Sequence, residues 1–214
     1  ASLVGSEMCI RDRVTGSGPA GLSSAYAAAK NGAKVILAED KPRFGGSLLT
    51  DDVTIDNLSG KAWTDKIITQ LKEMPNVIVK NRSQVFGYYD HNMTVMIEKT
   101  GDHLKDKPKY VPRQRLWYIR AKEVILSTGS IERPIVFGNN DTPGVFLSAA
   151  AKEYIKVYGV LVGKKPLVFT NNDSGYETAL EFKKHGVDPI ILDTREEHSS
   201  CLLYTSPSPR DLRE

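Results

Sequence analysis

Cysteine is almost missing from this chain of 214 residues, which has only two, Cys9 and Cys201, one near each end. A disulfide scaffold needs several pairs and a cysteine-based zinc site needs closely spaced thiols, so the sequence excludes both. The chain has no Cys-x-x-Cys pair, which argues against a disulfide reductase. Its 4 histidines are scattered without metal-ligand spacing, so no metal site is predicted.

Long apolar runs are also lacking. No run reaches the roughly 18 apolar residues of a membrane-spanning helix, so we expect no contact with a membrane. The scarcity of cysteine fits a reducing compartment and favours a cytoplasmic location. The net charge is a modest +3, although residues 105–122 are rich in Lys and Arg with aromatic residues between them. Because no nucleic-acid-binding module accompanies them, we expect no nucleic-acid partner and interpret this segment as a solvated hairpin or a docking surface for a partner subunit.

The most informative segment, residues 14–40, combines a glycine-rich turn, a helix, a short strand and an acid. Gly16 permits a tight turn, Gly18 lets a pyrophosphate approach the backbone, and Gly21 lets the helix pack closely on the strand. The free N–H groups at the start of the helix then face the phosphates. Glu39 is placed to accept hydrogen bonds from an adenosine ribose, which argues against a 2′-phosphate and therefore against NADP.

Three further segments are predicted to extend this site. A second glycine pair that ends at Gly46 lets a loop close over the pyrophosphate, and Ser47 offers a hydroxyl. Val85 is placed to offer backbone groups to an adenine. The turn that ends at Gly129 is typical of flavoproteins with two dinucleotide-binding domains, where it passes near the cofactor.

Hydrophobic periodicity predicts helices at residues 20–31 and 60–74, and strands at 35–38, 76–80, 84–87, 93–98, 116–120 and 124–129. In the second half it predicts a strand at 166–169, a helix at 178–185 and a strand at 190–193. The fold class is therefore α/β, with Rossmann-type βαβ units, a parallel sheet and a β excursion.

The second βαβ unit repeats the spacing of the first. Asp193 follows Gly175 by 18 positions, as Glu39 follows Gly21. Its turn carries Thr170 and Asn172 where the first unit has its first two glycines, and their side chains should obstruct a pyrophosphate. We therefore expect the second unit to keep the fold and to have lost ordinary dinucleotide binding.

The two ends of the chain are related at the DNA level. One DNA sequence can encode LVGSEMCIRD on one strand and CLLYTSPSPR on the other, and the pair resembles a transposase sequencing adaptor. We therefore interpret both ends as foreign, and expect the strand before Gly16 to form poorly because residues 9–13 supply most of it. The expected parts are an adaptor at 1–13, a first dinucleotide-binding domain at 14–162, the start of a second, degenerate domain at 163–200, and an adaptor at 201–214.

Five motifs carry a family resemblance, namely GSGPAGL (16–22), RFGGSLL (43–49), NVIVKNRSQVFGYYDHN (76–92), PRQRLWYIRAKEVILSTGSIERPIVFGNNDTPGVFL (112–147) and VFTNNDSGYETAL (168–180). Residues 14–197 resemble the alpha subunit of heterotetrameric bacterial sarcosine oxidase. The resemblance implies a truncated flavoprotein-like fold with two dinucleotide-binding domains. It also implies an oxidoreductase complex that acts on CH–NH donors and oxidises sarcosine with oxygen and tetrahydrofolate to glycine, a one-carbon product and hydrogen peroxide.

The resemblance also implies cofactors and partners. The alpha subunit holds NAD as a tightly bound, nonreacting ligand, with FAD in the beta subunit, FMN between alpha and beta, and tetrahydrofolate in a C-terminal region absent from this chain. The partners are the beta, gamma and delta subunits. No catalytic residue for amine oxidation is expected here. The implied NAD-site residues are Gly16, Ser17, Gly18, Ala20, Glu39, Asp40, Lys41, Ser47 and Val85.

Three alternatives stay open on the sequence. The chain is also compatible with the alpha subunit of a related amine or opine dehydrogenase. It is compatible with a dinucleotide-binding structural module without a redox role of its own. FAD is the alternative occupant of the first site.

Overall fold

The structure is a computed structural model that describes residues 3–106 and 108–195, with side chains from residue 9 onward. The chain divides into two compact units, the first ending at Gly129 and the second beginning at Ser130. The C-terminal segment expected to be foreign, including Cys201, lies outside the described residues.

The first unit is built on a sheet of six strands in the order β5-β2-β1-β8-β7-β6. Its parallel part consists of β1 (Leu3–Thr15), β2 (Val35–Ala38), β5 (Val77–Lys80) and β8 (Gln114–Leu126). Two antiparallel strands, β6 (Ser83–Tyr89) and β7 (Met93–Lys99), continue the sheet beyond β8. This arrangement confirms the predicted α/β fold with a parallel sheet and a β excursion.

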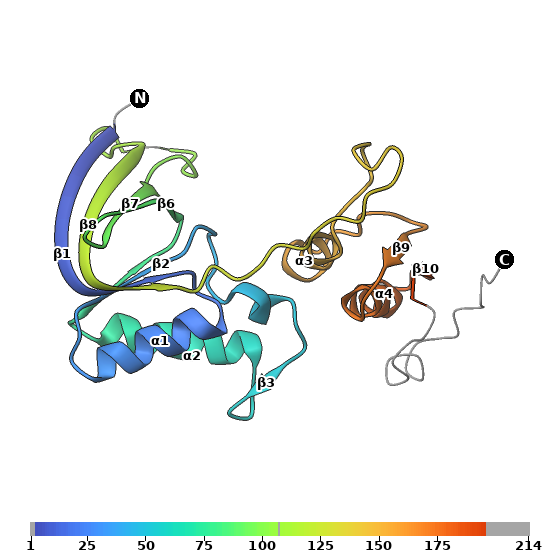
Figure 1. Cartoon of the computed structure of the whole chain (residues 1–214), viewed down its shortest axis with the longest axis horizontal. Helices are drawn as coiled ribbons and strands as arrows, with labels where there is room; N and C mark the ends of the chain where they lie inside the picture. The colour runs from blue at the N-terminus through green and yellow to red at the C-terminus, as the bar shows by residue number, and fades with distance from the viewer. Residues whose placement is uncertain (1–2, 107, 196–214) are drawn as a thin grey trace. The chain divides into compact units, whose positions relative to one another are not determined.

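Two helices, α1 (Pro19–Lys30) and α2 (Gly60–Glu73), cover one face of the parallel strands (Figure 1). Val14 and Leu37 of the strands pack in one buried cluster with Leu22, Trp63 and Leu71 of the helices. Trp63 is thus a core residue, as its helical spacing predicts. The connection between β2 and α2 contains a 3-10 helix, η1 (Gly46–Leu49), and a short hairpin of β3 (Thr54–Ile55) and β4 (Leu58–Ser59).

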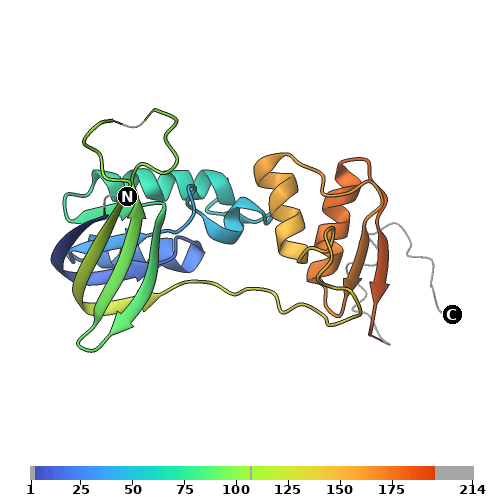
Figure 2. The same ribbon diagram turned by 90° about the horizontal axis from the view of Figure 1, so that it is seen from above.

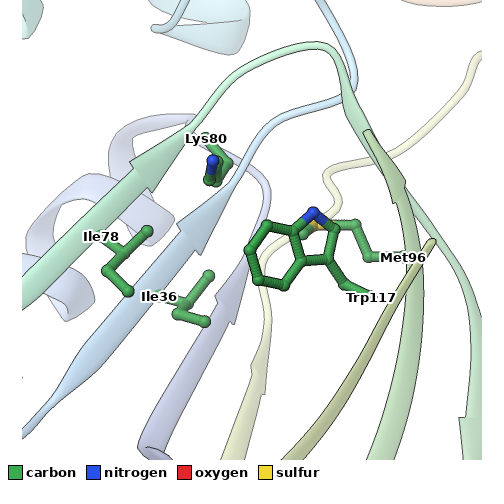
Figure 3. A pocket seen from close by; sticks show the side chains of 5 residues that line it. All are labelled: Ile36, Ile78, Lys80, Met96 and Trp117. Carbon is green, nitrogen blue, oxygen red and sulfur yellow. The ribbon is translucent and has the colours of Figure 1, made fainter. Parts of the chain in front are cut away.

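The antiparallel strands pack over the opposite face of the parallel sheet. Figure 3 shows Ile36 and Ile78 on the parallel strands opposite Met96 and Trp117 on β7 and β8, around a small, shallow pocket. Glu98 joins the two layers, because it accepts hydrogen bonds from Lys80 Nζ at 2.9 Å and from Trp117 Nε1 at 2.8 Å.

The structure corrects two strand predictions. Residues 116–120 and 124–129 were expected in separate strands, but β8 runs through the polar residues between them. Its residues from Gln114 to Leu126 pair with β1, and its first half also pairs with β7. The strand before Gly16 was expected to form poorly, yet β1 is a continuous strand of 13 residues. Pairing between β1 and β8 outweighs the local sequence in each case.

Arg13 of β1 is the unusual residue of this core. Its side chain is 0% exposed, and none of its three guanidinium nitrogens has a hydrogen-bond partner among the described residues. Arg13 pairs with Ile36 on β2 and Val124 on β8, so apolar residues flank it on both neighbouring strands. Burial lowers the pKa of this guanidinium to about 10.

The second unit contains two helices, α3 (Ser148–Tyr158) and α4 (Ser174–Lys184), and a two-stranded parallel sheet of β9 (Leu167–Thr170) and β10 (Ile190–Asp193) (Figure 2). The order β9-α4-β10 confirms the predicted second βαβ unit, whereas α3 was not predicted. Ile155 of α3 and Phe182 of α4 lie in one buried cluster. Helix α3 packs in the second unit, so the structure divides the chain after Gly129, well before the domain boundary expected at residue 162. The expected domain bounds stay a prediction.

Candidate dinucleotide-binding site

The glycine-rich turn between β1 and α1 is closely packed at two of its three glycines. Gly16 has a φ of +94°, and a Cβ there would lie 2.2 Å from the carbonyl oxygen of Ser127. A Cβ on Gly21 would lie 1.9 Å from the carbonyl oxygen of Gly16. Both positions therefore need glycine for the fold itself, as the motif predicts for the tight turn and for helix packing.

Gly18 differs from its two neighbours in the motif. Its backbone is extended, with φ −67° and ψ −176°, and a Cβ there would meet no atom within 4 Å. It is the N-cap of α1, Pro19 follows it, and no side chain caps the helix. The described residues thus leave open space beside the uncapped N–H groups of a helix, as expected of a place where an anion binds.

Glu39, the residue that follows β2, faces this turn. Its Oε2 accepts hydrogen bonds from the backbone N of Ser17 at 2.9 Å and from Ser17 Oγ at 2.5 Å, and its Oε1 accepts one from Lys41 N at 2.9 Å. Burial is the largest cause that raises the pKa of the Glu39 carboxyl. A hydrogen bond with Asp40 adds to the rise, and the donors on Ser17 and Lys41 oppose it. These donors fix the orientation of an acceptor-only group beside the helix N-terminus.

The second glycine pair closes on the first turn. Gly45 N donates to the carbonyl oxygen of Ser17 at 3.1 Å and to Ser17 Oγ at 3.2 Å. A Cβ on Gly46 would lie 3.0 Å from the Cα of Gly18. The loop predicted to cover the pyrophosphate therefore touches the turn, with Ser47 next in the chain. Its glycines are required by this close approach and by their positive φ.

The sequence motif did not reveal the structural roles of Ser17 and Gly45 in this site. The motif leaves the position of Ser17 free, so spacing alone did not reveal that its side chain joins the turn, the acid and the loop. A signal was present in the pairing of a hydroxyl at this variable position with an acid at the end of the next strand.

The remaining predicted residues lie around these elements. The start of β6 is fixed beside the acid, since Ser83 N donates to the Glu39 carbonyl oxygen at 2.7 Å, and Val85 follows two residues later. The turn after β8 is fixed beside β1, since Ser127 N donates to the Thr15 carbonyl oxygen at 2.8 Å, and Gly129 ends this turn with a φ of +69°. Ala20 lies in the first turn of α1. Asp40 and Lys41 continue from Glu39 on the chain.

The corresponding turn of the second unit is filled by its own side chains. Thr170 Oγ1 accepts a hydrogen bond from Asn172 N at 3.2 Å, and Asn172 Oδ1 accepts one from Ser174 N, the first residue of α4, at 3.0 Å. Asp193, the counterpart of Glu39, is paired with Arg195, whose Nη2 lies 2.8 Å from its Oδ2. Despite partial burial, the hydrogen bonds from Arg195 and Tyr176 lower the pKa of Asp193 to about 2.

The family model described as pyridine nucleotide-disulphide oxidoreductase matches residues 13–202. The chain belongs to the pyridine nucleotide-disulphide oxidoreductase family. This family of oxidoreductases has the flavin- or nucleotide-binding fold that the site geometry indicates. The two cysteines of the sequence lie at positions 9 and 201, so they do not form a Cys-x-x-Cys pair.

Within this family the chain is a homologue of sarcosine oxidase alpha subunits. It is 42% identical over 183 residues to the alpha subunit of sarcosine oxidase from Rhizobium meliloti (strain 1021), a match that covers 85% of this chain and 18% of the relative. It is 26% identical to a subunit of opine oxidase from Agrobacterium tumefaciens (strain Ach5), with 86% of this chain and 36% of that relative covered. The chain thus spans about a fifth of the length of its sarcosine oxidase relatives.

A solved structure confirms the fold of this family member. The L-proline dehydrogenase of P. horikoshii superposes with a TM-score of 0.71 at 24% identity, over 93% of this chain and 38% of that one. No helix among residues 3–106 and 108–195 is long and apolar enough to span a membrane.

Proposed function

We propose that the turn at Gly16–Gly21 holds the pyrophosphate of NAD, with Glu39 as the acceptor for the adenosine ribose. The observation that carries the proposal is Gly18. Its backbone conformation suits any residue and its missing side chain leaves only empty space, so the fold does not explain a glycine there. A pyrophosphate against the helix N-terminus does explain it, because a side chain would occupy the place of the ligand.

Glu39 supports NAD rather than NADP as the ligand. Its carboxylate is buried, oriented by Ser17 and Lys41, and able to accept hydrogen bonds from ribose hydroxyls. A 2′-phosphate at the same place would bring two negative charges together at a site of low polarity. The choice of NAD rather than FAD as the ligand rests on the family resemblance. The proposed site is completed by Asp40, Lys41, Gly46, Ser47, Val85 and Gly129.

We further propose that the chain is part of the alpha subunit of a sarcosine oxidase complex in the cytoplasm, with beta, gamma and delta subunits as its partners. The 42% identity to one such protein, against 26% to a subunit of an opine oxidase, supports this choice. NAD then binds away from the amine oxidation, which takes place in the beta subunit, and this part of the chain carries no catalytic residue. FAD, FMN and tetrahydrofolate belong to other regions of the complex.

The proposal is tested by Gly18→Ser in the full alpha subunit that contains these residues. Serine is a favoured N-cap residue, so with bound nucleotide removed from both proteins we expect the variant to melt at or above the temperature of the unchanged protein. Its side chain fills the ligand space and its hydroxyl competes for the helix N–H groups. The amount of NAD released on denaturation, measured by mass spectrometry, should therefore fall at least tenfold.

Gly138→Ser is the matched control, because Gly138 also has open space around its Cβ position and lies outside the site. It should keep the full amount of NAD. Normal NAD content in the Gly18→Ser variant would contradict the proposed pyrophosphate site. Release of FAD in place of NAD from the unchanged protein would refute the identity of the ligand.

A further inference from the structure

The outer face of the antiparallel strands β6, β7 and β8 has an unusual composition. The inner face is defined by Val85, Met96 and Trp117, which pack against Ile36 of the parallel sheet. Because side chains alternate along a strand, the positions between them point outward. The pairing register places one set of apolar residues on that outer face: Tyr89, Met93, Val95, Ile97, Leu116 and Tyr118. Phe86 is exposed beside them on the edge strand β6.

An antiparallel sheet with one solvated face normally alternates apolar and polar residues, and this face does not. Phe86, Tyr89 and Tyr118 are 58%, 53% and 40% exposed. Three aromatic side chains exposed to this extent present roughly 300 Å² of surface. An exposed apolar patch of this size is as large as the largest patch on an ordinary monomeric protein. It is smaller than a stable protein–protein interface, so it would form the centre of such an interface.

The patch is organised around Val95 and a strand irregularity. The register shifts between Val85 and Gly87, so that Phe86 lies at a bulge. A Cβ on Gly87 would lie 2.5 Å from the ring of Tyr89, so glycine makes room for this ring to lie across the strand. Val95 pairs with Gly87 and Tyr118 and is 5% exposed. The ring of Tyr89 is thus packed against the strand before any partner arrives, which lowers the entropy cost of binding.

The charges around the patch indicate its partner. On the outward positions where the three strands pair with one another, the described charged residues are Lys99 and Arg120, both cations. Like charges would oppose each other if two copies of this face met, which disfavours a symmetric dimer. A partner surface with an apolar centre and acidic residues at its edge would match both the aromatic rings and the cations of this face.

We propose that this outer face, centred on Phe86, Tyr89 and Tyr118, is the docking surface for another protein of the oxidase complex, one that presents an apolar patch edged by Asp or Glu. The inference rests on the proposed function for the existence of such a partner. The aliphatic residues between the rings favour a protein over a nucleic acid, which stacks its bases on separate aromatic side chains.

The test uses the full alpha subunit, expressed with its partner subunits, in the double variant Phe86→Ser/Tyr118→Ser. We expect its affinity for the partners, measured by light scattering over a dilution series, to fall at least tenfold, as for buried aromatic anchors. Tyr158→Ser is the control, since Tyr158 is 57% exposed on α3, outside these strands, and its affinity should not change. Hydroxyl-radical footprinting should show Phe86 and Tyr118 reactive in the isolated alpha subunit but protected in the complex.

Unchanged assembly of the double variant would overturn the proposal, and so would protection of both rings in the isolated alpha subunit. Binding of single-stranded RNA that the same variant abolishes, with assembly unaffected, would assign the surface to nucleic acid instead. NAD content is measured on the same samples. Its absence would count against the proposed dinucleotide site and leave the docking result standing.

Discussion

Replacement of Arg13 by methionine should stabilise the chain. The guanidinium is fully buried on β1 between Ile36 and Val124 and has no hydrogen-bond partner among the described residues. Methionine keeps the unbranched apolar stem and removes the charge together with its unsatisfied donors. Because the volume hardly changes, the substitution leaves no large cavity to offset the gain.

The size of the effect follows from the pKa of Arg13. Burial lowers this pKa from its ordinary value to about 10, and the difference corresponds to about 3 kcal/mol of cost to the charged form. Below pH 10 the group is protonated in both the folded and unfolded states, so the full cost applies at neutral pH. The cost fades only as the pH rises from about 10 towards the ordinary pKa of a guanidinium. We expect an increase of about 3 kcal/mol in the free energy of unfolding, or roughly 6–12 °C in melting temperature.

The measurement is urea unfolding followed by tryptophan fluorescence, since both tryptophans, Trp63 and Trp117, lie in the first unit. Arg11→Met is the control, because Arg11 lies on the same strand and is exposed; its effect should stay within about 0.5 kcal/mol. A loss of stability in the Arg13 variant would refute the reasoning, since it would show that the guanidinium makes a favourable interaction in the folded protein.

Two further predictions concern acidic residues. The proposed NAD site needs the ionised Glu39, whose pKa burial raises above its ordinary value. Calorimetric titrations should therefore show the affinity for NAD falling as the pH decreases through this raised pKa. Glu39→Gln should give a flat profile, and an unchanged profile in that variant would contradict the role of Glu39. Glu98→Ala removes the acceptor shared by Lys80 and Trp117, and should lower the free energy of unfolding by about 1–3 kcal/mol in chemical denaturation. Glu123→Ala on the exposed side of β8 is the control and should have little effect. Equal losses of stability in the two variants would argue against this hydrogen-bond network.

The elements with strong local signals were predictable from the sequence. The helix at α1 and the strand at β2 lie within one residue of their expected ends, because a glycine turn, a helix stop at Gly32 and a run of apolar residues define them locally. The roles of Gly16 and Gly21 also followed from the motif, since the packing they allow occurs within the βαβ unit itself.

The parts that depend on long-range contacts were not predictable. The residues Ala121–Glu123 look like a break between two strands, but their pairing with β1 makes them the middle of β8. Helix α3 was missed because its apolar stripe has meaning only against α4. The burial of Arg13 could not be foreseen, because arginine is rarely buried without a partner.

The hydrogen bond from Ser127 to Thr15 has a consequence for how the protein is made. The turn at Gly16 is completed by residues that the ribosome adds only after the whole β excursion, since Gly16 packs against Ser127. Closing so long a loop is entropically costly and slows folding. A nascent chain from which only the glycine motif has emerged therefore lacks the packing that completes the proposed nucleotide site. We expect binding competence to appear only when β8 has emerged, so that the first segment of the motif to be synthesised is among the last to become functional.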